Sequence, residues 1–298
     1  MEQEKRERRA VIDVLIGASA WGCLGLFTRY LAGFGMSPLA VAFFRSFSAT
    51  VMLACYLGMC SRETFRIRLR DVWMFVGTGF IAIGFFNVFY FATQNFTTLS
   101  IAAVLLYTAP FFVIIMSKLF FKEHITKQKV IALLLAFLGC LFVTGVVGGG
   151  GGTGTLAPIA IATGLASAFC YALYSIFGRV ALSHYAPMTV TFYSLFVSAI
   201  SLGIIFGVTG AEMPAMKWQM VAGICGLGFV STVIPYIFYT RGLQVLAPSK
   251  ASVLAFAEPM VATIVGILVM HEPLTIPAVI GIGLIFSGIV ILNRRSQK

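Results

Sequence analysis

The sequence predicts an all-α integral membrane protein, and three observations lead to that fold class. Hydrophobic residues make up 59% of the 298 residues and charged residues only 10%, whereas a soluble domain carries roughly a quarter charged residues. The mean hydropathy is +0.97, and the apolar residues form long runs separated by basic residues. A soluble fold of this length cannot bury so much apolar surface, so the surplus is expected to face lipid.

Ten runs are long enough to cross a bilayer as helices, which needs about 20 mostly apolar residues each. They lie at residues 11–32, 38–60, 72–95, 99–121, 128–147, 156–179, 188–209, 218–240, 249–270 and 275–293. The charged start of the chain leads directly into the first run, which is too long for the apolar part of a signal peptide. We therefore expect this run to be the first helix of the mature protein.

The basic residues set the orientation of these helices. When ten helices alternate in direction, all but three of the 21 Lys and Arg residues fall on one side. Arg29 and Lys217 fall on the other side, and Arg45 lies inside the second helix. The side rich in positive charge is the cytoplasmic one. We predict cytoplasmic termini and a multi-pass protein of the bacterial cytoplasmic (inner) membrane. The net charge of +11 then needs no nucleic-acid partner.

The two halves of the chain resemble each other after a shift of 149 positions, which aligns Pro110 with Pro259, Glu123 with Glu272 and Thr126 with Thr275 without a gap. Each half holds five helices, an odd number, so the halves must insert in opposite orientations. Inverted repeats of this kind occur in secondary transporters, with the binding site between the halves. We predict a first five-helix repeat at 1–147, a glycine-rich external linker at 148–155 and a second repeat at 156–298, around a central cavity. A monomer suffices to enclose it.

Each half also ends with a proline in an apolar helix, then a glutamate, then another apolar helix. The two motifs read YTAPFFVIIMSKLFFKE (Tyr107 to Glu123) and AFAEPMVATIVGILVMHE (Ala255 to Glu272). Over residues 11–293 this pattern resembles the EamA-like branch of the drug/metabolite transporter superfamily, of the amino-acid and metabolite exporter type. The resemblance implies ten helices in two inverted repeats around a substrate cavity, and members that export metabolites or move nucleotide sugars. It also implies transport without an ATPase module, and the sequence contains no P-loop motif.

Arg45 and Glu258 are the clearest charges well inside predicted helices. A charge within the bilayer needs a partner, a water-filled cavity or a ligand. Glu258 is a candidate proton carrier or anchor for a substrate amine, and Arg45 a candidate anchor for a substrate carboxylate. The structural alternatives are an ion pair between the two, a bond from Glu258 to backbone freed near Pro259, and snorkelling of Arg45 to the outer interface. Pro110 and Pro259 are candidate hinges, although membrane helices also tolerate proline without such a role.

Polar aromatic residues recur three positions apart, and residues at that spacing share one helix face. They are expected to line the cavity as a substrate-binding wall, whereas the alternative is ordinary helix packing with hydroxyl groups bonded to neighbouring backbone. The candidates are Trp21, Asn87, Tyr90, Tyr107, Tyr171, Tyr174, Tyr236 and Tyr239. Glu123 and Glu272 lie near membrane ends, where we expect them to cap or anchor the following helix.

These observations predict a secondary transporter, an exporter of amino acids or similar small metabolites that works by alternating access. Two alternatives stay open: a proton-coupled multidrug cation exporter, with Glu258 as the coupling group, and a nucleotide-sugar or phosphosugar exchanger. The exchanger usually needs several basic groups in the cavity, and only Arg45 lies well inside a helix. No enzyme, cofactor or metal site is expected, because no catalytic set stands at an interface and the His and Cys residues lack ligand spacing. The expected partners are a small-molecule substrate and the lipid bilayer.

Overall fold

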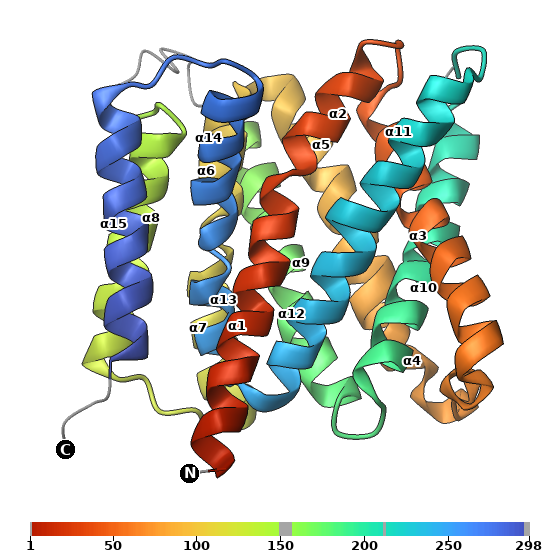
Figure 1. Ribbon diagram of the computed structural model, residues 1–298, viewed down its shortest axis with the longest axis horizontal. Coiled ribbons are helices and arrows are strands. Elements are labelled where there is room, and N and C mark those ends of the chain that lie inside the picture. The colour runs from red at the N-terminus through yellow and green to blue at the C-terminus, as the bar shows by residue number, and fades with distance from the viewer. Residues whose placement is uncertain (1, 149–156, 211–212, 295–298) are drawn as a thin grey trace.

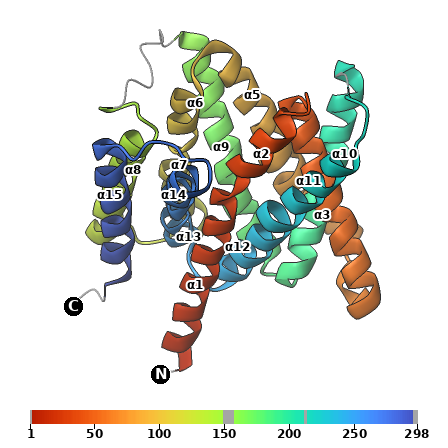
Figure 2. The same ribbon diagram turned by 45° about the horizontal axis from the view of Figure 1, so that its top comes forward.

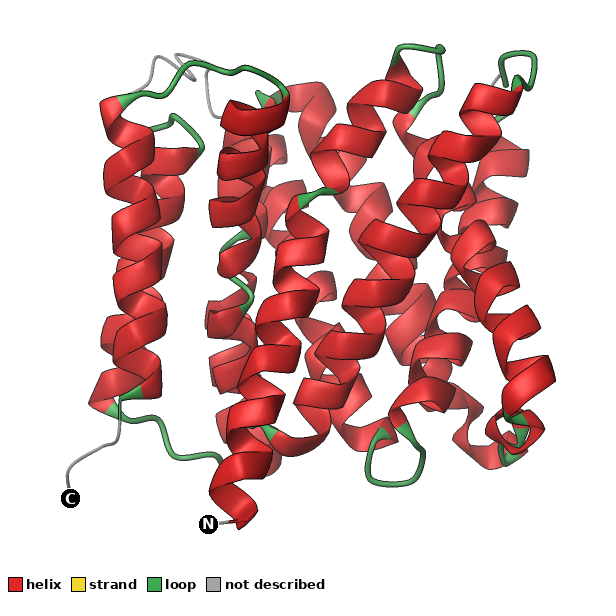
Figure 3. Cartoon of the chain, viewed as in Figure 1, coloured by secondary structure: helices red, strands yellow, loops and turns green. Residues whose placement is uncertain are grey.

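The structure is a computed structural model that describes residues 2–148, 157–210 and 213–294. Every regular element within these ranges is helical (Figure 3), so the predicted all-α class is confirmed. In the first half the helical segments are α1 (Glu2–Gly22), α2 (Leu24–Ala32), α3 (Pro38–Cys60), α4 (Val72–Phe75), η3 (Val76–Phe85), α5 (Phe86–Phe96), α6 (Leu99–Leu106), α7 (Ala109–Phe121) and α8 (Lys127–Val143). In the second half they are α9 (Pro158–Ala181), α10 (Pro187–Thr209), α11 (Trp218–Gly228), η4 (Phe229–Val233), α12 (Ile234–Val245), α13 (Pro248–Leu254), α14 (Ala257–Val269) and α15 (Ile276–Asn293).

Within the described residues, nine continuous helical stretches are long and apolar enough to cross a membrane. They coincide with nine of the ten predicted helices, within a few residues at their ends except at the start of the chain and at the end of the eighth helix. The remaining predicted helix, at 128–147, corresponds to α8, which is apolar but has 17 residues. Residues 149–156, most of the predicted linker, lie outside the described residues. The protein is thus a multi-pass helical membrane protein.

The first helix begins earlier than the sequence predicted, at Glu2 rather than at residue 11. Its charged first turns extend past the neighbouring helix ends in Figure 1. Glu2 and Glu4 lie in the first turn, where negative charge is favourable at the positive end of the helix dipole. Arg8 also pairs with Glu4 one turn away, at 3.0 Å. A charged segment can be helical outside the hydrocarbon region, and hydropathy alone does not locate the end of such a helix.

Several membrane-spanning stretches are interrupted. The chain breaks between α6 and α7 at Tyr107–Thr108, and between α13 and α14 at Ala255–Phe256. Pro110 and Pro259 follow these breaks within a few residues, and proline has no N–H to continue the helical hydrogen-bond ladder. The segments η3 and η4 are π-helical. This form is rare overall, but where it occurs it is often at a functional site. A shift of 149 positions makes η3 overlap η4.

The packing of the helices follows the same correspondence between the halves. The last helices of each half, α8 and α15, pack along each other on one side of the bundle (Figures 1 and 2). The second helices of each half, α3 and α10, also pack together. Under the shift of 149 positions α1 corresponds to α9, α5 to α12 and α7 to α14. The contact between α1 and α12 therefore corresponds to the contact between α5 and α9, and the contact between α1 and α14 corresponds to that between α7 and α9. Every one of these large interfaces therefore joins the two halves.

Glycines bring α8 and α15 into backbone contact. A Cβ atom added to Gly139 would lie 2.7 Å from the carbonyl oxygen of Gly281, and one added to Gly281 would lie 2.7 Å from that of Gly139. About two turns away on both helices, a Cβ atom on Gly288 would lie 2.8 Å from the carbonyl oxygen of Ala132. Small residues at such contacts allow helices in a membrane to approach closely.

The connection between α3 and α4 is held to the second half by a tyrosine. The Tyr185 hydroxyl donates to Asp71 Oδ2 at 2.7 Å and accepts from the backbone N–H of Arg68 at 3.0 Å. Asp71 is buried, with a second, longer contact to Arg70 Nε at 3.7 Å. Because Tyr185 lies between α9 and α10, this bond fixes the loops of both halves to each other.

Candidate functional site

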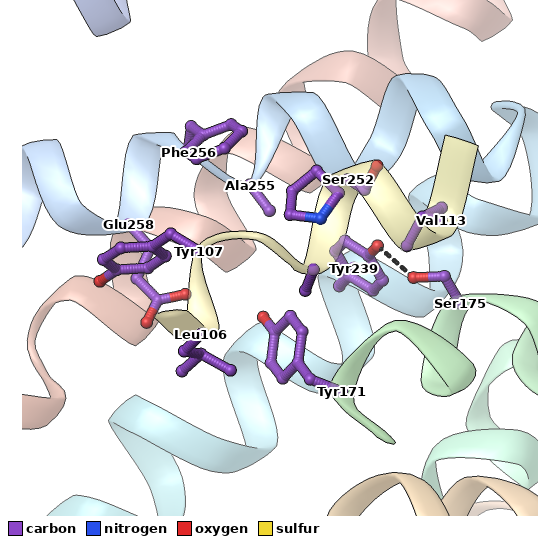
Figure 4. A pocket seen from close by; sticks show the side chains of 12 residues that line it. Leu106, Tyr107, Val113, Tyr171, Ser175, Tyr239, Ser252, Ala255, Phe256 and Glu258 are labelled. Atoms are coloured by element: carbon purple, nitrogen blue, oxygen red, sulfur yellow. Dashed lines mark hydrogen bonds between the residues drawn. The ribbon is translucent and has the colours of Figure 1, made fainter. Parts of the chain in front are cut away.

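A small cavity lies where the two interrupted stretches meet α9 and α12 (Figure 4). Its volume is about 30 Å³, which is room for about two water molecules. Its wall combines one carboxylate, three tyrosines and two serines with apolar groups. The lining residues are Leu106, Tyr107, Ala109, Pro110, Val113, Tyr171, Ser175, Tyr239, Ser252, Ala255, Phe256 and Glu258. The space is too small to hold an amino acid.

A second void of about 10 Å³ adjoins the first, and Tyr171, Ser175 and Tyr239 line both. Its remaining wall is formed by Trp21, Ala82, Ile83, Tyr174 and Tyr236. The two spaces together place seven of the predicted wall residues around one centre: Trp21, Tyr107, Tyr171, Tyr174, Tyr236, Tyr239 and Glu258. Pro110, a predicted hinge, lies in the same wall.

The aromatic residues of the second void form a tight cluster that joins three helices. The ring of Trp21 from α1 meets Tyr236 edge-on, with centroids 5.4 Å apart, and lies 5.3 Å from Tyr239. Tyr174 from α9 meets Tyr236 edge-on at 5.2 Å. Edge-to-face contacts are favourable because the positive ring edge meets a negative face. The cluster therefore fixes α1, α9 and α12 relative to one another beside the cavity.

Two tyrosine hydroxyl groups of this cluster, those of Tyr239 and Tyr174, are paired. The hydroxyls of Tyr239 and Ser175 are 2.8 Å apart, and those of Tyr174 and Thr240 are 2.9 Å apart. By contrast, no hydrogen bond from the hydroxyl of Tyr107 or Tyr171 to another described residue is present. Figure 4 shows both of these rings beside Glu258 at the same end of the cavity. That end consequently offers unsatisfied polar groups to a ligand or to water.

Glu258 contributes the only carboxylate among the residues that line the cavity. It stands in the first turn of α14, directly after the break at Ala255–Phe256. Arg45, on α3, is 7% exposed and does not line the cavity. Its Nε atom has no hydrogen-bond partner, and within the described part of the chain it forms no ion pair with Glu258.

Three other predicted residues lie away from the wall of the closed cavity. Asn87 is buried and donates from Nδ2 to the carbonyl oxygen of Ile83 at 2.7 Å. Tyr90 stacks on Phe86 at 5.8 Å. Pro259 is buried within α14 but is absent from the lining.

The structure also adds lining residues that the sequence did not single out. Ser175 lies one turn beyond Tyr171 on α9, so its place on the same face was readable from the spacing. Ser252 and Phe256 carried no comparable signal, because their position depends on the break in the helix beside them.

Contacts between the halves close both ends of the protein. At the end where α1 begins, Glu123 Oε1 accepts from both Lys129 and Ser249, and Lys250 Nζ pairs with Glu7 at 2.7 Å. At the opposite end, Arg29 pairs with Glu272 at 2.5 Å.

The predicted anchoring role of the two repeat-related glutamates agrees with these contacts, but neither glutamate caps the helix that follows it. Helix capping falls instead to Thr126 and Thr275, whose side chains accept from Lys129 N and Ala278 N.

The fold and the site define a polytopic membrane protein with an enclosed cavity between two similar halves. The sequence model of the EamA-like transporter family matches twice, at residues 8–145 and 158–294. The chain belongs to the EamA-like transporter family and is a membrane transporter.

Its relatives share nearly their whole length with it. The chain is 29% identical to an uncharacterized transporter of Archaeoglobus fulgidus over 95% of this chain and 98% of that protein. It is 27% identical to the uncharacterized transporter YxxF of Bacillus subtilis over 99% and 93% of the two chains, and 21% identical to the uncharacterized inner membrane transporter YicL of Salmonella typhimurium over 98% and 97%. One solved crystal structure has the same fold, with a TM-score of 0.80 at 18% identity over 95% and 96% of the two chains.

Proposed function

We propose that this transporter is an exporter of amino acids or similarly small zwitterionic metabolites and that it works by alternating access. The observation that carries the proposal is the placement of Glu258 and Arg45. One carboxylate lies in the cavity wall, and one buried guanidinium lies on α3 and forms no ion pair with it in the described part of the chain. Two unpaired opposite charges match the amine and the carboxylate of a zwitterion, and each then gains the partner that a buried charge requires. The aromatic wall suits the remaining apolar part of such a molecule.

We place this site between two inverted five-helix repeats, at 1–147 and 156–298, with α8 as the tenth crossing. In support, α1 begins and α15 ends at the same end of the bundle (Figure 1), which requires an even number of crossings. The family model matches each half separately. The large helix interfaces form pairs that correspond to each other under the shift of 149 positions, and the two π-helical segments overlap under the same shift. Inverted repeats place the substrate at the interface of the halves and let one half move against the other.

The closed cavity and the contacts at its two ends favour alternating access. Substrate entry requires the space to expand, and the helix breaks at Tyr107–Thr108 and Ala255–Phe256 are suited to act as hinges, because backbone rotation there disrupts no helical ladder. Opening toward the cytoplasm would break the bonds of Glu123 and Lys250, whereas opening outward would break the pair of Arg29. A monomer in the bacterial cytoplasmic membrane suffices for this cycle, which involves no chemical conversion of the substrate.

A second candidate function, proton-coupled export of organic cations, is favoured by one observation. The lining of the cavity carries a carboxylate and aromatic ring faces but no Arg or Lys side chain, and ring faces attract cations. The same composition disfavours phosphosugar or nucleotide-sugar exchange, since phosphates require several basic groups.

The test is counterflow of labelled compounds in proteoliposomes, with an amino-acid panel and the matching decarboxylated amines. Zwitterion transport predicts uptake of an amino acid and loss of that uptake in Glu258→Gln. It also predicts that Arg45→Gln transports the amino acid and its amine equally well. Glu63→Gln, an exposed cytoplasmic glutamate, is the matched control and should behave as the wild type. Preference of the wild type for amines would favour the cation exporter, and uptake of no compound in either panel would reject both functions.

A further inference from the structure

A larger pocket opens at the cytoplasmic end, away from the central cavity. Its volume is about 480 Å³, and it lies between the start of α1, the start of α10 and the end of α12. Three arginines and one aspartate line it together with apolar side chains. The lining residues are Arg6, Arg9, Ala10, Asp13, Pro187, Met188, Ile237, Arg241, Gln244 and Val245. The pocket therefore combines basic groups with apolar side chains.

The helical spacing directs these charges into one space. Arg6, Arg9 and Asp13 recur at intervals of three and four residues, which places them on one face of α1. Arg241 stands opposite, on α12, and Gln244 follows one turn later on the same face. The three guanidinium groups and the single carboxylate leave a net positive charge in the pocket.

The arginines of the pocket have little competition from protein carboxylates. Within the described residues, neither Arg6 nor Arg9 forms an ion pair or a side-chain hydrogen bond. Arg241 lies 3.7 Å from Asp13 Oδ2, beyond hydrogen-bond distance, and 5.5 Å from the centre of the Phe238 ring.

Two other acidic groups on α1 are engaged elsewhere. Glu4 pairs with Arg8 at 3.0 Å, and Glu7 pairs with Lys250 at 2.7 Å. The donor groups of the pocket thus remain available to an anion from outside the chain.

The location specifies the kind of anion. Arg6 and Arg9 precede the apolar run of α1, so they lie at the level where lipid phosphates lie on the cytoplasmic side. Met188, Ile237 and Val245 provide an apolar wall that continues into the hydrocarbon region, suited to a glycerol backbone and the start of an acyl chain. Basic pockets between helices on this side of a membrane bind phospholipid head groups, and arginine binds phosphate oxygens in a bidentate fashion.

We propose that this pocket binds the phosphate group of an anionic phospholipid of the inner leaflet. The binding site is separate from the substrate cavity and does not depend on the transported compound. Because α1 and α12 carry Trp21, Tyr236 and Tyr239 further along, a bound lipid also braces the two helices that hold the aromatic cluster.

Native mass spectrometry of the detergent-solubilised protein tests the proposal, with phosphatidylglycerol and phosphatidylcholine added in equal amounts. The wild type is expected to retain one phosphatidylglycerol in preference to phosphatidylcholine. Each charge removed should weaken retention about fivefold, so Arg6→Gln combined with Arg9→Gln should weaken it at least tenfold. Both side chains are exposed and bond to nothing in the described chain, so this variant tests the site without endangering the fold. Adding Arg241→Gln should abolish the preference.

The matched control removes three exposed arginines from another cytoplasmic connection, as Arg62→Gln, Arg66→Gln and Arg68→Gln. Equal loss of phosphatidylglycerol in the control and in the pocket variants would overturn the proposal, since general surface charge would then explain binding. Retention unchanged in the pocket variants would overturn it as well. A parallel thermal-shift titration with glycerol 3-phosphate and inorganic phosphate identifies the source of the phosphate. Stabilisation by these soluble anions, lost in the pocket variants without any lipid preference, would reject the lipid and assign the pocket to a soluble phosphate.

Discussion

The contact between α8 and α15 allows one prediction to be worked out from the structure in detail. A Cβ atom added at Gly281 would lie 2.7 Å from the carbonyl oxygen of Gly139 and 2.7 Å from Val143 Cγ1. Favourable contact begins at about 3.5 Å, so Gly281→Ala forces the helices apart by roughly 1 Å. Overpacking of this kind costs about 1–3 kcal/mol. Alanine also favours helix over glycine by about 1 kcal/mol, which partly masks that cost.

A matched control removes the contribution of helix propensity. Gly283 lies two residues away on the same helix, and a Cβ atom there would meet nothing within 4 Å. Gly283→Ala therefore gains the same helix propensity without the clash. The difference between the two variants isolates the packing cost.

The assay is thermal unfolding of purified protein in detergent, followed by size-exclusion profiles after heating. With about 2–4 °C of Tm per kcal/mol, Gly281→Ala should melt between about 2 and 12 °C below Gly283→Ala. Gly139→Ala should resemble Gly281→Ala, because its Cβ meets the opposite carbonyl oxygen at the same distance. Equal melting temperatures for the variants at 281 and 283 would refute the close backbone contact.

Further predictions concern individual side-chain bonds. Arg29→Gln removes a largely exposed ion pair, so it should cost less than about 1 kcal/mol, and any difference in Tm from the wild type should vanish in 1 M salt. Tyr185→Phe leaves the buried Asp71 carboxylate without its closest donor and should destabilise by about 1.5–3 kcal/mol. Burial raises the pKa of Tyr185 above its ordinary value, so the wild type keeps its full advantage below pH ~10 and loses it as pH rises further. A difference between wild type and variant that stays constant above that pH would contradict this reasoning. Tyr239→Phe breaks the 2.8 Å bond to Ser175 at a cost of about 0.5–1.5 kcal/mol, and denaturation curves equal to the wild type would contradict that bond.

The sequence predicted the membrane-spanning helices well because lipid imposes a strict requirement on each of them. A segment that crosses hydrocarbon must be apolar along its whole length, so hydropathy alone locates it. The interruptions were harder to predict. Pro110 and Pro259 marked two of them, and Pro235 follows the π-helical segment η4 within two residues. The break at Cys23 and the segment η3 have no proline nearby, and they depend on packing between helices.

The sequence predicted how deep in the membrane the candidate residues lie, but not which way their side chains point. The sequence located Arg45, Asn87 and Tyr90 within the membrane, yet it could not fix the rotation of their helices about the long axis. A helix that is apolar on all sides has no amphipathic face to orient it. Tyr236 and Tyr239 both line the second void, because their spacing puts both side chains on one helix face, whichever way that face turns.

The pairing of α8 with α15 has a consequence for biogenesis. The two helices are separated by most of the second half of the chain, and synthesis proceeds from the N-terminus. During synthesis α8 therefore lacks this partner until the final helix emerges, and this close backbone contact is among the last to form. A chain truncated before Ile276 would leave the Gly139 face of α8 without its partner.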